Sequence, residues 1–282
     1  MQDAIAIPSK GFTHGGKFHA DDVFSTALLL ILNPEYTYER GMTPPKDFDG
    51  IVYDIGLGVF DHHQADRRVR ENGIPYAAFG LLWEAFGARL LPSMWKEFDK
   101  DFIQPLDLSD NTGVPNALAD AIDYFNPAWD VSALVNSGFP EAVELAKQVL
   151  ERAIKRYESM ERAKEHVEEA LRQAQDHILI LPTHMPWKNF ITADIDFVVY
   201  PSTRGGYNAQ AIDLDIEAGT HRCEFPSEWY GHSDAELVAI SGRPGLRFCH
   251  KSGFLLAGDD LETILNVCKE AVAAKYGTNA SH

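Results

Sequence analysis

Three short stretches near the start of the 282-residue chain decide its fold and point to its chemistry: THGGKFHADD at residues 13–22, GIVYDIG at 50–56 and VFDHHQ at 59–64. They hold four of the eleven histidines, each with aspartates close by. A single histidine in such a stretch is more often an ordinary loop residue than a ligand. Two polar clusters beside apolar runs are costly to place near a core unless their charges are compensated, so the combination favours a binding site.

The apolar pattern around these stretches predicts a parallel α/β sheet. Residues 4–8 and those leading to His14 predict a strand, residues 22–33 a buried helix that Pro34 ends, and residues 50–56 a second buried strand. Strand, helix and strand in this order are typical of parallel sheets, whose binding sites form beyond the carboxyl ends of the strands. We therefore expect Asp54 to meet the His14 loop at one edge of the sheet.

The residue types suit a divalent metal centre. The candidate side chains are His14, His19, Asp21, Asp54, Asp61, His62 and His63. A carboxylate such as Asp54 can bridge two cations. Two cations assist phosphoryl transfer by placing positive charge beside both the attacking water and the leaving oxygen. Imidazoles suit Mn²⁺, Zn²⁺ or Fe²⁺ better than Mg²⁺. The pattern predicts two bound Mn²⁺ ions, with Mg²⁺, Zn²⁺ and Fe²⁺ as alternatives.

The rest of the chain predicts a long helix and a second α/β region. Apolar residues recur at steps of three and four through residues 139–176. Helices are also expected over residues 76–86, 91–106 and 260–276, a turn at 110–113, and strands at 36–39, 178–181, 197–200, 207–212, 246–250 and 254–256. We expect an N-terminal domain (1–135), a connecting helix (136–176) and a smaller C-terminal domain (177–282).

Composition limits the partners and the location. The formal net charge of −17 repels nucleic acid and anionic membranes in bulk, so a long duplex is not expected, whereas a short oligonucleotide or a small phosphate ester is. The three cysteines, Cys223, Cys249 and Cys268, predict buried thiols in a reducing compartment. Without a signal peptide or a long apolar run, we expect a cytoplasmic protein. The sequence leaves a homodimer open.

The same motifs carry a family resemblance. THGGKFHADD, VYDIG and FDHHQ, followed by LDLSDNTG at 106–113, FPSEWYGHSDAEL at 225–237 and FCHKSGF at 248–254, resemble the MYG family of the DHH phosphoesterase superfamily. The motifs occur in the right order over most of the chain. The resemblance implies a DHH-type parallel-sheet domain that binds metal and a C-terminal domain that binds substrate.

The resemblance also implies roles for single residues. His14, His19 and Asp54 would hold the first metal. Asp21, Asp54, His62 and an aspartate of the 107–110 segment would hold the second, with Asp107 favoured over Asp110. His63 would contact the phosphate or act as an acid. Asp61 would orient its histidine neighbours, and Asp22 would open the helix beside the site. Substrate contacts would come from Arg204, Gly205, Gly206, His250, Lys251 and Ser252 of the C-terminal domain.

The function expected from the resemblance is metal-dependent phosphodiester hydrolysis, with a 3′–5′ exonuclease acting on RNA or short oligonucleotides as the first choice. One alternative is a phosphatase or pyrophosphatase that acts on a small molecule, because metal sites of this kind do not choose among phosphate esters. The other alternative is a protein that binds metal or nucleotide without turnover. The intact set of candidate ligands argues against this last reading.

Overall fold

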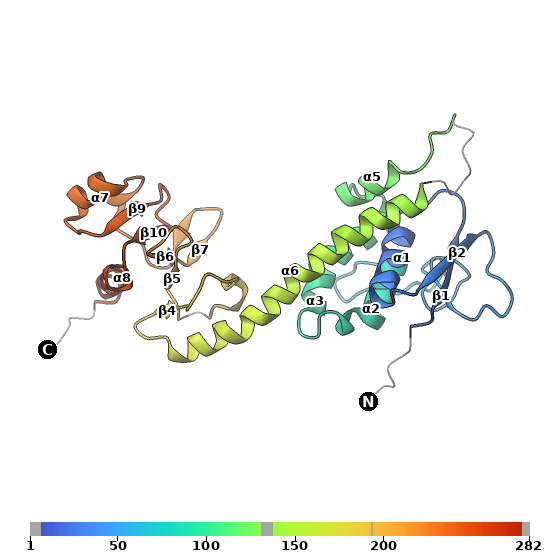
Figure 1. Ribbon diagram of the computed structural model, residues 1–282, viewed down its shortest axis with the longest axis horizontal. Helices are drawn as coiled ribbons and strands as arrows, with labels where there is room; N and C mark the ends of the chain where they lie inside the picture. The colour runs from blue at the N-terminus through green and yellow to red at the C-terminus, as the bar shows by residue number, and fades with distance from the viewer. Residues whose placement is uncertain (1–6, 131–137, 193, 278–282) are drawn as a thin grey trace. The chain divides into compact units, whose positions relative to one another are not determined.

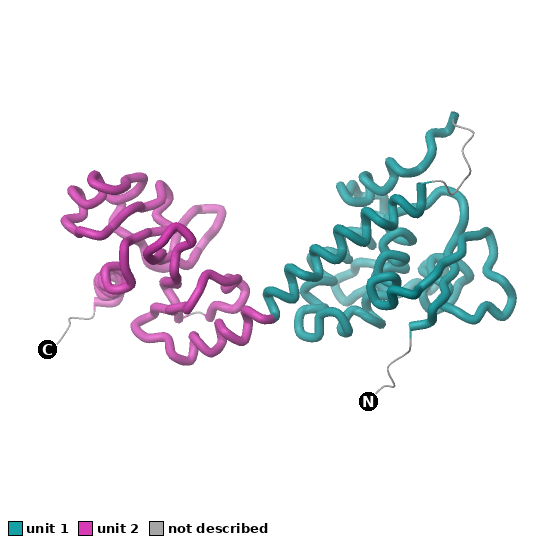
Figure 2. The backbone as a smooth tube through the Cα atoms, in the orientation of Figure 1, with its two compact units in different colours: residues 1–161 teal, residues 162–282 magenta. Residues whose placement is uncertain are grey.

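The computed structural model describes residues 7–130, 138–192 and 194–277 (Figure 1). The chain divides into two compact units, residues 1–161 and 162–282, coloured separately in Figure 2. The division falls inside helix α6 (Phe139–Gln173), the helix expected at 136–176. Residues 136 and 137 lie outside the described part. The roles assigned to the two domains stay predictions.

The first unit is built on a parallel three-stranded sheet. Strand β1 (Lys10–His14) lies between β2 (Thr37–Gly41) and β3 (Ile51–Val52), and both neighbours run parallel to it. Helix α1 (Ala20–Leu32) connects β1 to β2, and Asn33 and Pro34 follow it. The mixed α/β class with an N-terminal parallel sheet is therefore confirmed. Residues 4–6 of the expected first strand lie outside the described part.

A run of helices packs against α1. It comprises α2 (Ala78–Phe86), α3 (Trp95–Phe98), a π-helical turn η2 (Asp99–Ile103), α4 (Gln104–Thr112) and α5 (Ala117–Asp123). The sequence predicts a turn at 110–113, but α4 continues through Thr112. Gly113 then ends the helix with a left-handed φ of 73°, a conformation that glycine adopts without steric cost. Asp110 and Asn111 are therefore helical residues.

Helix α6 packs on the first unit through aromatic side chains. The Phe139 ring meets Phe18 edge-on at 5.4 Å and Tyr38 at 5.5 Å between ring centres. Further along the helix, the Tyr157 ring lies edge-on to Phe98, and its hydroxyl donates a 2.6 Å hydrogen bond to Asp101. In the described residues, no helix combines the length and the apolarity needed to span a membrane.

The second unit contains a five-stranded mixed sheet. Its strand order is β4-β5-β6-β10-β9, formed by Ile178–Ile180, Phe197–Pro201, Tyr207–Ala211, Leu255–Gly258 and Leu246–Cys249. Strands β4 and β5 are parallel, and the other neighbours are antiparallel. A small ribbon pairs β7 (Asp213–Asp215) with β8 (Thr220–His221).

The last part of α6, together with α7 (Asp234–Ser241) and α8 (Leu261–Tyr276), completes the second unit. Short 3₁₀ turns lie at Gly87–Arg89, Lys188–Phe190 and Ser227–Trp229. The three cysteines are free and buried, as the sequence predicts, and belong to the core of this unit.

A buried ion-pair network ties the helices of the first unit together. The Arg70 guanidinium donates to the Asp99 carboxylate at 3.1 and 2.7 Å, and its Nη2 lies 2.8 Å from Asp107 Oδ2. It also stacks over the Tyr76 ring at 3.8 Å. The Gly80 amide, in the first turn of α2, donates to Asp107 Oδ1 at 3.2 Å. Arg70 and Asp107 thereby join α2 to α4 and to the π-helical turn.

This network makes Gly80→Ala destabilising. Alanine favours a helix interior by about 1 kcal/mol over glycine, but its Cβ would overlap the Asp107 carboxylate and lie 2.7 Å from Arg70 Nη2. Disrupting one partner of a buried ion pair costs about 3–5 kcal/mol. We expect a net loss of about 2–4 kcal/mol in the free energy of unfolding, measured by urea denaturation. Gly58→Ala is the matched control, because no atom lies within 4 Å of its added Cβ. A Gly80→Ala protein as stable as its parent would contradict the packing described.

Candidate metal centre

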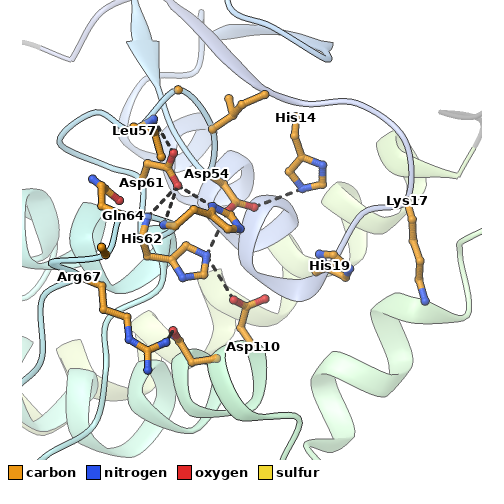
Figure 3. Close-up of a pocket in the computed structure, with 15 residues that line it drawn as sticks. His14, Lys17, His19, Asp54, Leu57, Asp61, His62, Gln64, Arg67 and Asp110 are labelled. Atoms are coloured by element: carbon orange, nitrogen blue, oxygen red, sulfur yellow. Dashed lines mark hydrogen bonds and ion pairs between the residues drawn. The ribbon is translucent and has the colours of Figure 1, made fainter.

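The carboxyl ends of β1 and β3 bring the first two candidate ligands together. His14 is the last residue of β1, and Asp54 follows β3 by two residues. Because these strands are parallel neighbours, both side chains lie at one edge of the sheet. His14 Nε2 lies 3.2 Å from Asp54 Oδ2. Figure 3 shows the two side chains pointing toward each other.

Asp54 is the centre of the site. Its second oxygen, Oδ1, lies 3.2 Å from His62 Nε2 and 3.8 Å from His63 Nδ1. Burial raises the pKa of this carboxyl group, but the hydrogen bonds and charges of His14 and His62 outweigh burial and lower the pKa to about 2. The backbone of Asp54 has a φ of 55°, in the left-handed region that few residues other than glycine, asparagine and aspartate enter. This backbone turns the carboxylate between the two imidazoles.

The start of α1 supplies two more carboxylates. Asp22 Oδ2 lies 3.3 Å from both His14 Nε2 and Arg40 Nη2, while its Oδ1 accepts the His19 amide at 2.9 Å. Asp22 therefore caps the helix, as expected, and also touches the site. Burial raises its pKa to about 7, against the opposing effects of His14 and Arg40. Burial lowers the pKa of His14, but the Asp54 and Asp22 carboxylates raise it to about 9.

Asp21 reaches the site from the buried side. It accepts the amides of Ala78 and Phe79 at 3.0 and 2.7 Å, so it caps the amino-terminal end of α2. Its Oδ2 lies 3.7 Å from His62 Nε2. Burial, followed by repulsion from Asp54 and Asp110, raises the pKa of Asp21 well above its usual value. The site therefore carries more buried negative charge than its protein partners neutralise.

Asp61 shapes the loop that presents the two histidines of the triplet. Its oxygens accept the amides of Leu57, His62 and His63 at 2.7, 2.8 and 3.2 Å. Asp61 Oδ1 also lies 2.7 Å from His63 Nδ1. Burial opposes ionisation of Asp61, but these hydrogen bonds lower its pKa, so the ionised carboxylate accepts from Nδ1–H. The other ring nitrogen of His63, a largely exposed side chain, stays available to a ligand.

The structure separates the two aspartates of the 107–110 segment. Asp110 Oδ2 lies 3.4 Å from His62 Nε2. Asp107 is buried in the ion pair with Arg70 and the hydrogen bond from Gly80, and it belongs to none of the ligand groups found among the described residues. The sequence favours Asp107 because Asp110 begins DNTG, which has the composition of a turn. Because α4 runs through this segment, Asp110 has a place in the site.

Three overlapping groups of side chains have ligand atoms close enough to share a cation. They are His14, Asp22 and Asp54; Asp54, His62 and His63; and Asp21, His62 and Asp110, with the atoms of each group within 4.8 Å of one another. We call these residues the ligand cluster. His19 is outside these groups, although its ring lies 5.9 Å from that of His14. The donor types and the excess negative charge fit divalent cations.

The ligand cluster opens on a cavity of about 980 Å³. Eight lining residues were not anticipated as site residues from the sequence, among them Lys17, Leu57, Arg67 and Asn111. Lys17 Nζ pairs with Asp123 at 2.9 Å, and Arg67 Nη1 donates to Asn111 Oδ1 at 3.3 Å. The only signal for Lys17 and Arg67 in the sequence is their position within or just after the two histidine motifs.

The six candidate substrate residues lie in two separate turns of the second unit. Arg204, Gly205 and Gly206 form the turn between β5 and β6, whereas His250, Lys251 and Ser252 lie between β9 and β10. Tyr207 pairs with Gly258 and Gln210 with Leu255, so these turns lie at opposite ends of the sheet, roughly 13 Å apart along a strand. Ser252 donates its amide to His250 Nδ1 at 3.2 Å. The structure does not bring the six residues into one group.

Comparison with known proteins assigns the family. Residues 11–272 match the family model MYG1_exonuc, described as Uncharacterised protein family (UPF0160). The chain belongs to this family. The MYG1 protein of Dictyostelium discoideum is 27% identical over 299 residues, which cover 86% of this chain and 90% of that protein. The MYG1 exonuclease of Rattus norvegicus is 27% identical over 332 residues (96% and 86%), and that of Homo sapiens 26% identical over 332 residues (96% and 88%). The search of solved structures found no significant match.

In this MYG1 family member, Asp110 and Asp107 allow a paired test of the site. Asp110→Asn should lower the number of metal ions bound per chain after dialysis against Mn²⁺, measured by inductively coupled plasma mass spectrometry. The same change should leave the metal-free protein at least as stable, because it removes one of several neighbouring carboxylates that repel one another.

Asp107→Asn should give the opposite result. Metal content should stay normal while stability falls, because Arg70 loses one of its two carboxylate partners. Loss of metal in the Asp107 variant, with normal binding in the Asp110 variant, would reverse the assignment.

Proposed function

We propose that the chain is a divalent-metal-dependent phosphodiesterase that removes nucleotides from the 3′ end of RNA or short oligonucleotides. We further propose that it belongs to the DHH phosphoesterase superfamily. The observation that carries the proposal is the position of Asp54, which belongs to two ligand groups and faces His14 with Oδ2 and His62 with Oδ1. A carboxylate shared in this way is what a pair of catalytic cations requires.

The residues divide into two ligand sets. His14, His19 and Asp54 would hold one ion, with Asp22 close to it, and Asp21, Asp54, His62 and Asp110 would hold the other. Mixed imidazole and carboxylate donors favour Mn²⁺, with Mg²⁺, Zn²⁺ and Fe²⁺ as alternatives. When bound, the two ions would supply a hydroxide nucleophile and neutralise charge on the leaving oxygen.

The protein groups around the ligand cluster would position and protonate the substrate. Asp61 holds His63 by Nδ1, so the exposed ring edge of His63 is free to contact the phosphate or to protonate the leaving oxygen. The amides at the start of α2 hold Asp21, and Arg40 holds Asp22, so both carboxylates keep their orientation without substrate. Such preorganisation reduces the reorganisation needed during reaction.

The names of the relatives support the nuclease reading. Relatives from Rattus norvegicus and Homo sapiens are named MYG1 exonucleases and align with nearly the whole chain. The net charge of −17 opposes binding of a long duplex and favours short or single-stranded substrates. We propose that the second unit contributes substrate contacts. Because its two candidate turns lie at opposite ends of their sheet, each of them should be tested separately.

The assay is metal-dependent hydrolysis of a 5′-labelled RNA 10-mer in EDTA, Mg²⁺ or Mn²⁺, resolved on a sequencing gel. We expect a ladder that shortens from the 3′ end, seen only with metal and fastest with Mn²⁺. Asp54→Asn should abolish the ladder and lower metal content, because it removes the shared charge while keeping the shape and backbone preference of the residue.

If the folded, metal-loaded protein leaves the RNA intact, the proposed exonuclease activity is contradicted. Pyrophosphate and dinucleotides are the next substrates, and their hydrolysis would favour the small-molecule alternative. Unchanged turnover in the Asp54 variant would contradict the two-metal mechanism. If the protein hydrolyses none of these phosphate esters, the remaining reading is a protein that binds metal or nucleotide without turnover.

A further inference from the structure

The cavity over the ligand cluster contains one lysine and one arginine side chain, which lie on different sides of it. Among the residues that line the cavity, these are Lys17 and Arg67. In Figure 3, Lys17 lies beyond His19, whereas Arg67 lies on the other side of the cluster, below His62. A polyanionic substrate would therefore meet cationic groups at both ends of the metal centre.

The two side chains differ in whether a protein carboxylate already neutralises their charge. Lys17 Nζ lies 2.9 Å from the Asp123 carboxylate. For Arg67, no carboxylate among the described residues lies within ion-pair distance, and the contact found is the 3.3 Å hydrogen bond from Nη1 to Asn111. A guanidinium has five N–H donors. Arg67 thus keeps its charge and most of its donors for a ligand, in a chain whose net charge is −17.

Asn111 accepts from the Arg67 guanidinium from a fixed position in α4. Its Nδ2 donates to the backbone oxygens of Asp107 and Tyr76, at 2.9 and 3.2 Å, so its Oδ1 is turned toward Arg67. Asn111 directly follows Asp110 in α4. The guanidinium therefore lies just past the Asp110 end of the ligand cluster, and it belongs to none of the ligand groups.

We propose that Arg67 binds the phosphate next to the one that is cleaved, and that it makes the site prefer oligonucleotides to esters with a single phosphate. This inference rests on the proposed phosphodiesterase function. The cleaved phosphate must lie among the ligand groups, and Arg67 is anchored outside them. A planar guanidinium can bind a neighbouring phosphate through paired hydrogen bonds.

The test compares two substrates in Mn²⁺. One is an RNA 5-mer, and the other is the p-nitrophenyl ester of uridine 5′-monophosphate, which has one phosphodiester and no neighbouring phosphate. Arg67→Ala should raise KM for the 5-mer about 10-fold, the effect of losing a charged hydrogen bond. Its kcat, its metal content and its kinetics on the single ester should not change. Arg67→Lys should give an intermediate KM.

Arg68→Ala is the matched control. Arg68 neighbours Arg67 and is also exposed, but it pairs with Glu84 at 2.6 Å and does not line the cavity. The Arg68→Ala change should leave the kinetics on both substrates unchanged. Only the loss of Arg67 should reduce the salt dependence of kcat/KM on the 5-mer, by about 0.7 in logarithmic slope for one phosphate contact.

Equal losses on the two substrates would overturn the proposal, because Arg67 would then act on the cleaved phosphate or on the fold. If the parent protein cleaves neither substrate, the proposed function itself has failed. Arg67 is then judged by the anisotropy of a fluorescein-labelled RNA 5-mer. Weaker binding by Arg67→Ala, with normal binding by Arg68→Ala, would retain Arg67 as a phosphate-binding residue. Equal affinities would remove that role.

Discussion

The constraint on which the first unit depends is the repulsion among its buried carboxylates. Asp21, Asp22 and Asp54 are almost completely buried, and Asp110 lies beside them. Such charges are tolerated in a protein interior only where hydrogen bonds and opposite charges compensate them. The fold compensates these charges with three kinds of group: backbone amides at the start of α2, the imidazoles of His14 and His62, and the guanidinium of Arg40.

Two buried arginines play equivalent parts on the two sides of this arrangement. Arg40 pairs with Asp22 and stacks on the Phe139 ring at 3.9 Å. Arg70 pairs with Asp107 and stacks on Tyr76 at 3.8 Å. In both cases an aromatic ring holds the guanidinium plane while its N–H groups face a carboxylate. Neither arginine lines the cavity. Arg40 holds a carboxylate of the ligand cluster, whereas Arg70 holds α4, the helix that carries Asp110.

Local patterns in the sequence were sufficient for the sheet and for its edge. Apolar runs ended by glycine or proline predict most of the strands, and parallel order is enough to place His14 beside Asp54. The place of Asp110 was harder to predict, because the segment DNTG at 110–113 has the composition of a turn. Whether Asp110 lies in a turn or in a helix depends on how α4 packs through Asp107 onto Arg70, thirty-seven positions earlier in the chain. The positions of Arg67 and of the two turns in the second unit likewise depend on distant neighbours and on strand register, which no local pattern encodes.

The left-handed backbone at Asp54 has a consequence for how this family could lose activity during evolution. At a φ of 55°, most side chains would strain the loop that follows β3. A lineage that abandons catalysis but keeps the fold therefore has few replacements open at this position, chiefly asparagine or glycine. If Asp54 bridges two cations as proposed, either residue at this point of an otherwise similar sequence would mark a family member that lacks the bridging charge.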